Sequence, residues 1–295
     1  MEFSTSQTGK FTRAISVIIP VYNEAGHVRS MILRLRQALS ERGLIYEIIV
    51  VNDGSTDKSS HELQNTQGIT LLAHPYNKGY GASLKTGAKQ ARYDWLLCYD
   101  ADGQHEPQSA LDLIEHVTNY DMIIGSRIGY QGPALRQPGK YVLKKIACYA
   151  VGFKIPDLNS GLRLVRTELF HRYEHLYPQG FSLSTTITLA FIKYEHTVKF
   201  VPISIKKREG KSTVKPKDAL HTLKLIFRII MIFSPLRFFM PLTLFLLVFG
   251  IISLGIDVHR ENLTDMTILL FLSSLIIGSL SLIADQIASI RREMF

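Results

Sequence analysis

The stretch YEIIVVNDGSTD at residues 46–57 joins an apolar run to a polar loop that contains glycine. Similar apolar runs stand at 15–20, 69–74 and 95–100, and each is followed by a segment with a helical pattern. Runs of Val, Ile and Leu without polar alternation are typical of strands that are buried on both faces. Strands that alternate with helices predict an α/β fold over residues 15–205, with a mostly parallel sheet and helices on both faces.

Polar loops follow three of the predicted strands, at 21–24, 53–57 and 100–104. Ligands of parallel sheets bind at the carboxyl ends of the strands, so we expect these loops to meet at one binding edge. Asp100 and Asp102 are two residues apart, and neighbouring carboxylates repel each other unless a cation offsets their charge. Mg²⁺ or Mn²⁺ accepts one or two carboxylates together with phosphate oxygens of a substrate. The pattern therefore favours a metal–diphosphate site over a solvated acidic turn.

Other short motifs narrow the possible sites. No G-x-G-x-x-G follows the first predicted strand and the chain has no G-x-x-x-x-G-K-[ST], so a dinucleotide site and a P-loop are not supported. Residues 53–55 read Asp-Gly-Ser, a motif that fits a ligand-binding loop and a simple turn with a helix cap equally well. The only cysteines are Cys98 and Cys148, too few for a disulfide framework or a thiolate metal cluster.

The positive charge of the chain is concentrated in one region. Lys and Arg number 34 against 25 Asp and Glu, which gives a formal net charge of +9. Residues 199–237 hold ten of the positive and two of the negative residues, so the rest of the chain is nearly neutral. Nucleic-acid binding would call for a basic face on a soluble domain. Here the charge immediately precedes two long apolar runs, which indicates a membrane surface and no nucleic-acid partner.

The two apolar runs, 238–258 and 266–290, are each long enough to cross a bilayer as a helix. The short polar linker between them, 259–265, requires an antiparallel hairpin. Lys and Arg flank the hairpin on both sides, which predicts that the domain of residues 15–205 and both termini are cytoplasmic. Residues 206–237 are expected to form a basic loop and an amphipathic interfacial helix, although a soluble amphipathic helix has the same pattern. The polar ends of the chain, 1–14 and 291–295, are predicted to be tails.

Seven motifs in a fixed order resemble glycosyltransferase family two, and more narrowly its branch of dolichol-phosphate mannosyltransferases and bacterial polyprenyl-phosphate glycosyltransferases. They are VIIPVYNE (17–24), VNDGSTD (51–57), NKGYGASLKTGAKQA (77–91), DADGQHEP (100–107), GSR (125–127), DLNSGLR (157–163) and KREGKST (207–213). The resemblance implies a Rossmann-like GT-A fold followed by an interfacial helix and two transmembrane helices. The chain departs from the family at 159–162, which reads NSGL, and at 181–186, where an acidic residue often stands.

The resemblance also implies roles for individual residues. Those that match positions holding the nucleotide are Pro20, Tyr22, Glu24, Asp53, Lys78 and Asp100. Those that match the Mg²⁺ or Mn²⁺ ligands are Asp100, Asp102 and Gln104. The cations expected to hold phosphate groups are Arg127, Arg136, Lys140, Arg163, Arg208 and Lys211, because guanidinium groups bind two phosphate oxygens at once. Asp102, Arg208 and Asp100 are the expected catalytic residues.

The expected reaction is metal-dependent transfer of a sugar, with inversion, from a UDP- or GDP-linked donor to undecaprenyl or dolichyl phosphate. A phosphate monoester is largely ionised at neutral pH, so this acceptor needs no general base. Two alternatives remain open at this point. One is a hydroxyl acceptor on a glycolipid, for which Asp157 is the candidate base. The other is a silent, membrane-anchored protein that binds nucleotide sugar. A partner flippase and a homo-oligomer are further expectations.

Overall fold

We describe a computed structural model that covers residues 14–293 except 118, 128–136, 181 and 207–215. The chain forms two compact units. The first comprises Met1–Tyr130 and Pro156–Lys211, and the second comprises Gln131–Ile155 and Ser212–Phe295. The boundaries expected from the sequence placed residues 131–155 in the catalytic domain, whereas the structure groups this segment with the C-terminal helices.

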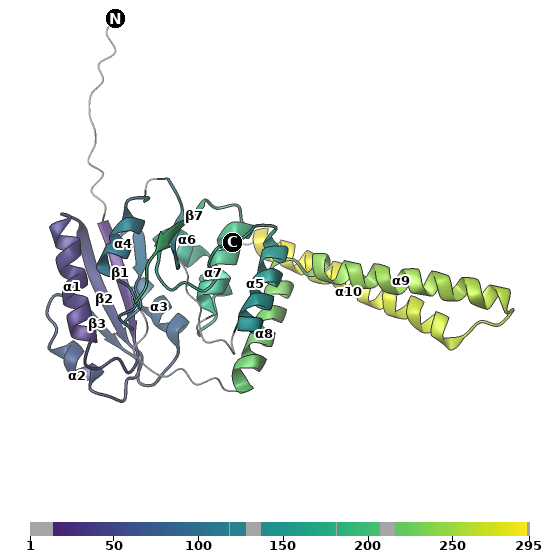
Figure 1. Ribbon diagram of the computed structural model, residues 1–295, viewed down its shortest axis with the longest axis horizontal. Coiled ribbons are helices and arrows are strands. Elements are labelled where there is room, and N and C mark those ends of the chain that lie inside the picture. The colour runs from purple at the N-terminus through teal and green to yellow at the C-terminus, as the bar shows by residue number, and fades with distance from the viewer. Residues whose placement is uncertain (1–13, 118, 128–136, 181, 207–215, 294–295) are drawn as a thin grey trace, which may run out of the picture. The chain divides into compact units, whose positions relative to one another are not determined.

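The first unit is built on a seven-stranded sheet with the order β3-β2-β1-β4-β6-β5-β7 (Figure 1). All neighbouring strands pair in parallel except β6, which is antiparallel to β4 and β5. The mostly parallel sheet predicted from the sequence is therefore confirmed. The strands are β1 (Ala14–Val21), β2 (Ile45–Asn52), β3 (Thr70–Ala73), β4 (Trp95–Cys98), β5 (Met122–Arg127), β6 (Arg163–Arg166) and β7 (Val198–Ile203).

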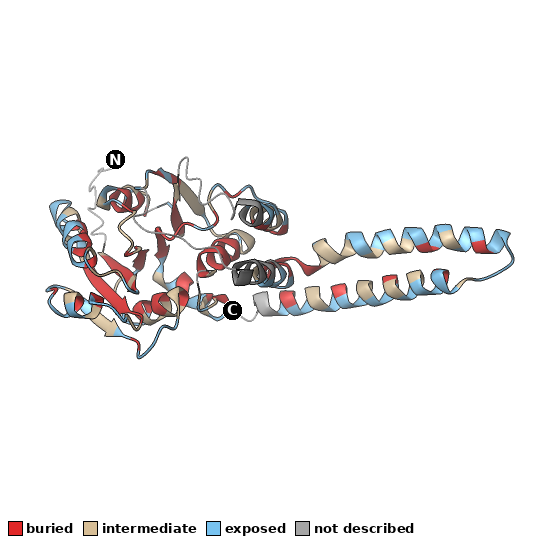
Figure 2. Cartoon of the chain, turned by 60° about the horizontal axis from the view of Figure 1, so that its bottom comes forward, coloured by how far each residue is buried: buried red, intermediate tan, exposed pale blue. Residues whose placement is uncertain are grey.

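Helices cover both faces of this sheet because the side chains of a strand alternate between its faces. One face of β1 contributes Ile15, Val17 and Ile19 to the core that also contains the buried residues of α1. Ile18 lies on the other face, against α3. The buried sheet is red in Figure 2. The helical elements of the first unit are α1 (Val28–Glu41), α2 (Ser59–Gln64), α3 (Tyr80–Ala88), α4 (Pro107–Ile114), α6 (Thr167–Arg172), the 3₁₀ helix η2 (Glu174–Leu176) and α7 (Leu183–Lys193).

The second unit contains four helices, of which α5 was not expected there. These are α5 (Gln137–Val151), α8 (Pro216–Phe233), α9 (Pro235–His259) and α10 (Asp265–Glu293). α5 packs on α8. The link from α8 to α9 is also tied to α5, since Ser234 Oγ donates to the carbonyl of Ala150 at 2.6 Å and Arg237 Nη1 donates to that of Tyr149 at 2.8 Å.

α9 and α10 form the predicted hairpin, and both are long and apolar enough to span a membrane. Only 6% and 17% of the residues in their most apolar windows are buried, unlike the core helix of a soluble protein. Many large apolar residues of both helices are exposed, and exposed residues are pale blue in Figure 2. The buried face of α10 carries small residues seven positions apart, the spacing of two helices that wind around each other: Thr267, Ser274, Ser281 and Ala288.

The turn of the hairpin is held by one buried acidic side chain. Asp257, in the last turn of α9, is 4% exposed. Its Oδ2 accepts hydrogen bonds from the backbone N–H of Thr264 at 2.8 Å and from the hydroxyl of Thr267 at 2.6 Å. These bonds join the end of α9 to the start of α10, and a buried carboxylate requires such donors.

Gly87 provides the test of how closely α3 packs on the sheet. A Cβ at this position would lie 2.5 Å from Cγ2 of the buried Ile18. We expect Gly87→Ala to lower the free energy of unfolding by about 1–3 kcal/mol through overpacking, despite the better helix propensity of alanine. The measurement is denaturant unfolding of the detergent-solubilised chain. Gly180→Ala is the control, because nothing lies within 4 Å of that Cβ. Equal stability of the two variants would contradict the close contact.

Candidate functional site

The site lies at the carboxyl ends of the parallel strands of the first unit. β1 pairs with β2 on one side and with β4 on the other, so the loops that follow these three strands are neighbours. These loops contain residues 22–27, 53–58 and 99–106. The sheet therefore brings together the three polar loops that the sequence placed at a common edge.

The first two loops are held together by hydrogen bonds. Asn23 has a left-handed backbone with φ of 55°, and its Oδ1 accepts the backbone N–H of Thr56 at 2.8 Å. The backbone N–H groups of Glu24 and Ala25 donate to Ser59 Oγ at 2.9 Å and to Asp57 Oδ2 at 3.1 Å. These hydrogen bonds fix the shape of the loop after β1.

Asp53 joins the second loop to the segment that leads into α3. Its buried carboxylate accepts the backbone N–H groups of Lys78 and Gly79 at 2.9 and 2.8 Å and pairs with His74 Nδ1 at 2.6 Å. Gly54 follows with φ of 65°, and a Cβ there would lie 2.5 Å from the backbone carbon of Tyr76. A residue with a side chain would force these two segments apart.

The other residues expected to hold the nucleotide surround this junction. Tyr22 is exposed, and Pro20 and Glu24 are half-buried. Lys78 is exposed, with its Nζ 5.8 Å from the centre of the Tyr76 ring. Aromatic rings and a cation beside a sheet edge offer stacking and charge to a nucleotide.

Asp100 follows β4 and lies in a narrow space. Its Oδ1 accepts a hydrogen bond from the hydroxyl of Tyr80 at 2.9 Å, and its Oδ2 lies 3.8 Å from His105 Nε2. On the other side is the backbone of Gly161, where any Cβ would overlap Asp100 Oδ2. Burial raises the pKa of Asp100, but His105, Tyr80 and the charge of Arg163 outweigh burial and hold this pKa below its usual value. Burial and Asp100 raise the pKa of Tyr80 well above its usual value, so Tyr80 remains the donor.

Asp102 and Gln104 lie in the turn after Asp100, and both are half-buried. The backbone N–H of Gln104 donates to Asp102 Oδ1 at 3.1 Å, and the carbonyl of Gln104 accepts the N–H of Lys206 at 3.0 Å. Among the described residues no group of three or more His, Cys, Asp or Glu could hold a metal ion. Two carboxylates and an amide oxygen instead fit a hard cation that completes its shell with substrate oxygens and water.

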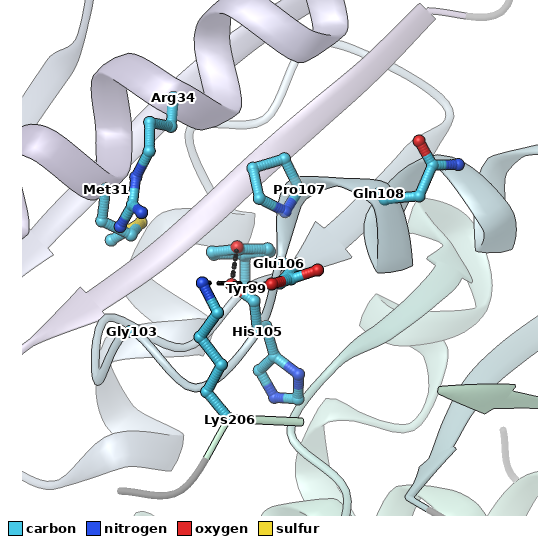
Figure 3. A pocket seen from close by; sticks show the side chains of 9 residues that line it. All are labelled: Met31, Arg34, Tyr99, Gly103, His105, Glu106, Pro107, Gln108 and Lys206. Atoms are coloured by element: carbon cyan, nitrogen blue, oxygen red, sulfur yellow. Dashed lines mark hydrogen bonds and ion pairs between the residues drawn. The ribbon is translucent and has the colours of Figure 1, made fainter. Parts of the chain in front are cut away.

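A cavity of about 240 Å³ lies on the α1 and α4 side of this turn (Figure 3). Figure 3 shows Lys206 extending to Glu106, with which it pairs at 3.0 Å. The hydroxyl of Tyr99 donates to the carbonyl of His105 at 2.6 Å. Together with the bridge between His105 and Ile205, these contacts fix the turn that carries Asp102 and Gln104.

Arg127, one of the cations expected to hold phosphate, forms a two-pronged pair with Asp157. Nε and Nη2 of Arg127 donate to the two carboxylate oxygens at 2.6 and 2.8 Å. Side-chain exposures are only 18% for Arg127 and 12% for Asp157. Burial raises the pKa of Asp157, but Arg127 outweighs burial and holds this pKa below its usual value. Asp157 is therefore a poor general base near neutral pH.

Arg163 does not lie where its side chain could contact a phosphate group of a substrate. It is completely buried in β6. Its guanidinium donates to the carbonyl oxygens of Ser160 and Ser184 and to Thr188 Oγ1. This geometry makes Arg163 a core residue that orders the backbone beside Gly161, and the expected direct contact with a phosphate needs correction. A buried arginine in a β-strand cannot be distinguished from an exposed one by its motif alone.

The remaining predicted cations cannot be placed. Arg136, Arg208 and Lys211 lie outside the described residues, and Lys140 lies in α5 with its side chain outside them. Sequence reasoning also missed Tyr80, His105 and Gly161. All three occur in motifs that were recognised, but only the fold shows that they lie against Asp100.

The sheet order and the polar loops at its edge define a fold class, the GT-A-like folds. Glucosyl-3-phosphoglycerate synthase from Mycobacterium tuberculosis, solved in complex with Mn²⁺, UDP and phosphoglyceric acid, superposes with a TM-score of 0.58. That match has 17% identity and covers 74% of this chain and 78% of the other. Mannosyl-3-phosphoglycerate synthase from Rubrobacter xylanophilus gives a TM-score of 0.57, also at 17% identity, and the match covers 74% of this chain and 72% of the other. At these identities the likeness shows the fold alone.

The particular family follows from the sequence models. The model of glycosyl transferase family 2 matches residues 16–173, and the model described as the GtrB C-terminal hairpin matches residues 234–290. The chain belongs to glycosyl transferase family 2, and it is a glycosyltransferase.

Three relatives illustrate the range of similarity. An uncharacterized protein of Methanocaldococcus jannaschii is 29% identical, over 78% of this chain and 97% of that protein. A dolichol-phosphate mannosyltransferase of Pyrococcus furiosus is 32% identical, over 73% and 63%. An undecaprenyl-phosphate 4-deoxy-4-formamido-L-arabinose transferase of Pseudomonas aeruginosa is 31% identical, over 52% and 48%. The match thus spans about half to two thirds of the relatives whose activity is named.

The Arg127–Asp157 pair predicts a specific dependence of stability on pH. Because the pKa of Asp157 is lowered in the folded state, the pair stabilises the fold above the unfolded pKa of about 3.9 and this stabilisation is lost as the pH falls further. We expect Asp157→Asn to cost about 2–3 kcal/mol at pH 7, and this difference to shrink below about pH 4.

The measurement is the unfolding of wild type and variant in detergent between pH 3 and pH 7. Asp112→Asn is the control, because Asp112 accepts its hydrogen bond from Gln108 on an exposed face of α4. A difference between wild type and Asp157→Asn that stays constant across the whole range would contradict the role of the pair.

Proposed function

We propose that the protein transfers a sugar from a nucleotide diphosphate sugar to a polyprenyl phosphate at the cytoplasmic face of a membrane. Two relatives whose names specify dolichol phosphate or undecaprenyl phosphate support the acceptor class. A structural neighbour solved with UDP supports the donor class. An oxygen of the acceptor phosphate attacks the anomeric carbon, the bond to the nucleoside diphosphate breaks, and the configuration at that carbon inverts.

The observation that carries this proposal is that Asp157, the candidate general base, is paired with Arg127. Asp157 is bound through both oxygens by the guanidinium of Arg127, which lowers its pKa, and the backbone N–H groups of Arg127 and Asn159 donate to the same oxygens. The first turn of α7, where the family often has an acidic residue, contains none. A hydroxyl acceptor needs a group to take its proton, whereas an ionised phosphate does not. The geometry therefore favours the phosphate acceptor over the hydroxyl alternative.

Asp100, Asp102 and Gln104 would hold the divalent metal ion, Mg²⁺ or Mn²⁺. Bound there, the metal supplies positive charge that stabilises the diphosphate leaving group. The protein itself contributes positioning. The loop joined by Asp53 would hold the nucleotide beside Tyr22 and Lys78, with Pro20 and Glu24 next to them.

The acceptor phosphate would be held by the cations that the family resemblance assigns. Arg208 and Lys211 are proposed to contact it, with Arg136 and Lys140 as further candidates. Arg127, which is paired with Asp157, is proposed to contribute positive charge beside them. Fixed cations lower the barrier by placing the two phosphate-bearing substrates side by side.

The membrane location is part of the same proposal, because a polyprenyl chain stays in the bilayer. α5 exposes Tyr141 next to Lys145, and α8 exposes Phe227 and Met231 near Lys224. Apolar rings combined with lysines are typical of helices that lie in the membrane interface. The excess of Lys and Arg on both sides of the hairpin favours a cytoplasmic orientation. A flippase partner and self-association remain predictions from the family resemblance.

Transfer can be tested directly with purified protein in lipid. The protein is incubated with polyprenyl phosphate, Mg²⁺ or Mn²⁺, and a panel of radiolabelled UDP and GDP sugars. We expect metal-dependent label in the organic phase from one donor, and a loss of at least a hundredfold in Asp102→Asn, because removing a metal ligand removes charge from the leaving group.

The control is Asp112→Asn, which removes a carboxylate from α4 and should leave the rate unchanged. Tight binding of one donor without any transfer to the lipid would contradict the proposal and favour the silent-protein alternative.

A further inference from the structure

The carboxylate of Asp100 has little freedom on one side. The backbone at Gly161 lies so close to Oδ2 that no side chain fits between them. Arg163 fixes that backbone from the core by binding the carbonyl of Ser160. The remaining freedom of Asp100 is rotation of its carboxylate plane, which the polar groups around it must control.

Two of these groups are His105, whose Nε2 lies 3.8 Å from Oδ2, and Tyr80. Its hydroxyl donates to Asp100 Oδ1 at 2.9 Å. The residue before it, Gly79, donates its backbone N–H to Asp53 Oδ2 at 2.8 Å. The first turn of α3 is fixed on its other side too, because the N–H of Ala82 donates to the carbonyl of Gln179 at 2.9 Å. The start of α3 thus spans from the nucleotide side of the site to the metal side.

The glycines on either side of Tyr80 make this arrangement possible. A Cβ at Gly79 would lie 2.8 Å from the carbonyl oxygen of Gln179, and one at Gly81 would overlap the carbonyl of Pro178. The backbone of residues 178–179 can therefore press against the start of α3. The start of α3 is held between this backbone and Asp53, and these contacts position Tyr80.

We propose that Tyr80 is a positioning residue that orients Asp100 for the divalent metal. Its hydrogen bond to Oδ1 sets the plane of the carboxylate, while Oδ2 lies between the backbone of Gly161 and His105 Nε2. This inference rests on the proposed function, in which Asp100 is one of the groups that hold the metal. Partners that orient a metal ligand typically change metal affinity by 10- to 100-fold when they are removed.

Tyr80→Phe removes only the hydroxyl. We expect Mn²⁺ binding in the presence of UDP, measured by the electron paramagnetic resonance signal of free Mn²⁺, to weaken by about 10- to 100-fold. Transfer should fall by a similar factor at low Mn²⁺ and largely recover at high Mn²⁺. UDP binding without metal and the melting temperature should stay close to wild type, because the Asp53 contacts are backbone bonds that the variant keeps.

Tyr173→Phe is the matched control. Tyr173 is also buried in the first unit, and its hydroxyl bonds His196 Nε2 at 2.7 Å. This variant should bind Mn²⁺ like wild type. The inference would be overturned if Tyr80→Phe bound Mn²⁺ as wild type does. It would also be overturned if only Tyr80→Phe failed to fold, because the hydroxyl would then have a structural role. If wild type transfers no sugar, the proposed function fails, while Mn²⁺ binding with UDP still reports on Tyr80.

Discussion

The contact between Asp53 and the segment before α3 is the constraint on which the rest of the site depends. A buried carboxylate must be satisfied by donors, and Asp53 obtains them from the backbone of Lys78 and Gly79 and from His74. Charge-assisted bonds of this kind are strong and directional. They fix the start of α3, which fixes Tyr80, and Tyr80 in turn contacts Asp100. Two loops that are far apart in the sequence thereby become one rigid surface.

The acidic residues at this edge of the sheet can lie close together because those most shielded from solvent accept hydrogen bonds from neighbouring groups. Asp53 binds backbone amides, Asp100 binds Tyr80, and Asp157 binds Arg127. Asp102 lies in a turn that is half-exposed to solvent. In the proposed reaction, Asp100 and Asp102 would hold a cation and Asp157, whose pKa Arg127 lowers, would not serve as the base. This arrangement suits a reaction in which the acceptor arrives already ionised.

The sequence predicted β1, β2, β3 and β4, the polar loops after three of them and the apolar hairpin, because each leaves a local pattern, but it did not predict β5, β6 or β7. It could not separate residues 131–155 from the catalytic domain, since α5 packs on α8, far along the chain. Arg163 matched a family motif, yet its burial depends on β6 lying between β4 and β5. Tyr80 was missed for a similar reason, because its contact with Asp100 is made across the sheet edge. Non-local packing of this kind leaves no short-range signal.

The central claim is that the acceptor is a phosphate and needs no base from the protein. The most direct test compares two acceptors of the same chain length, a polyprenyl phosphate and the corresponding free polyprenol, with the donor that the protein uses. The account predicts rapid labelling of the polyprenyl phosphate and no labelling of the free polyprenol above background. The rate with the phosphate should be the same in folded Asp157→Asn as in wild type, although the variant protein is less stable. Comparable labelling of the free polyprenol, lost in Asp157→Asn, would contradict it.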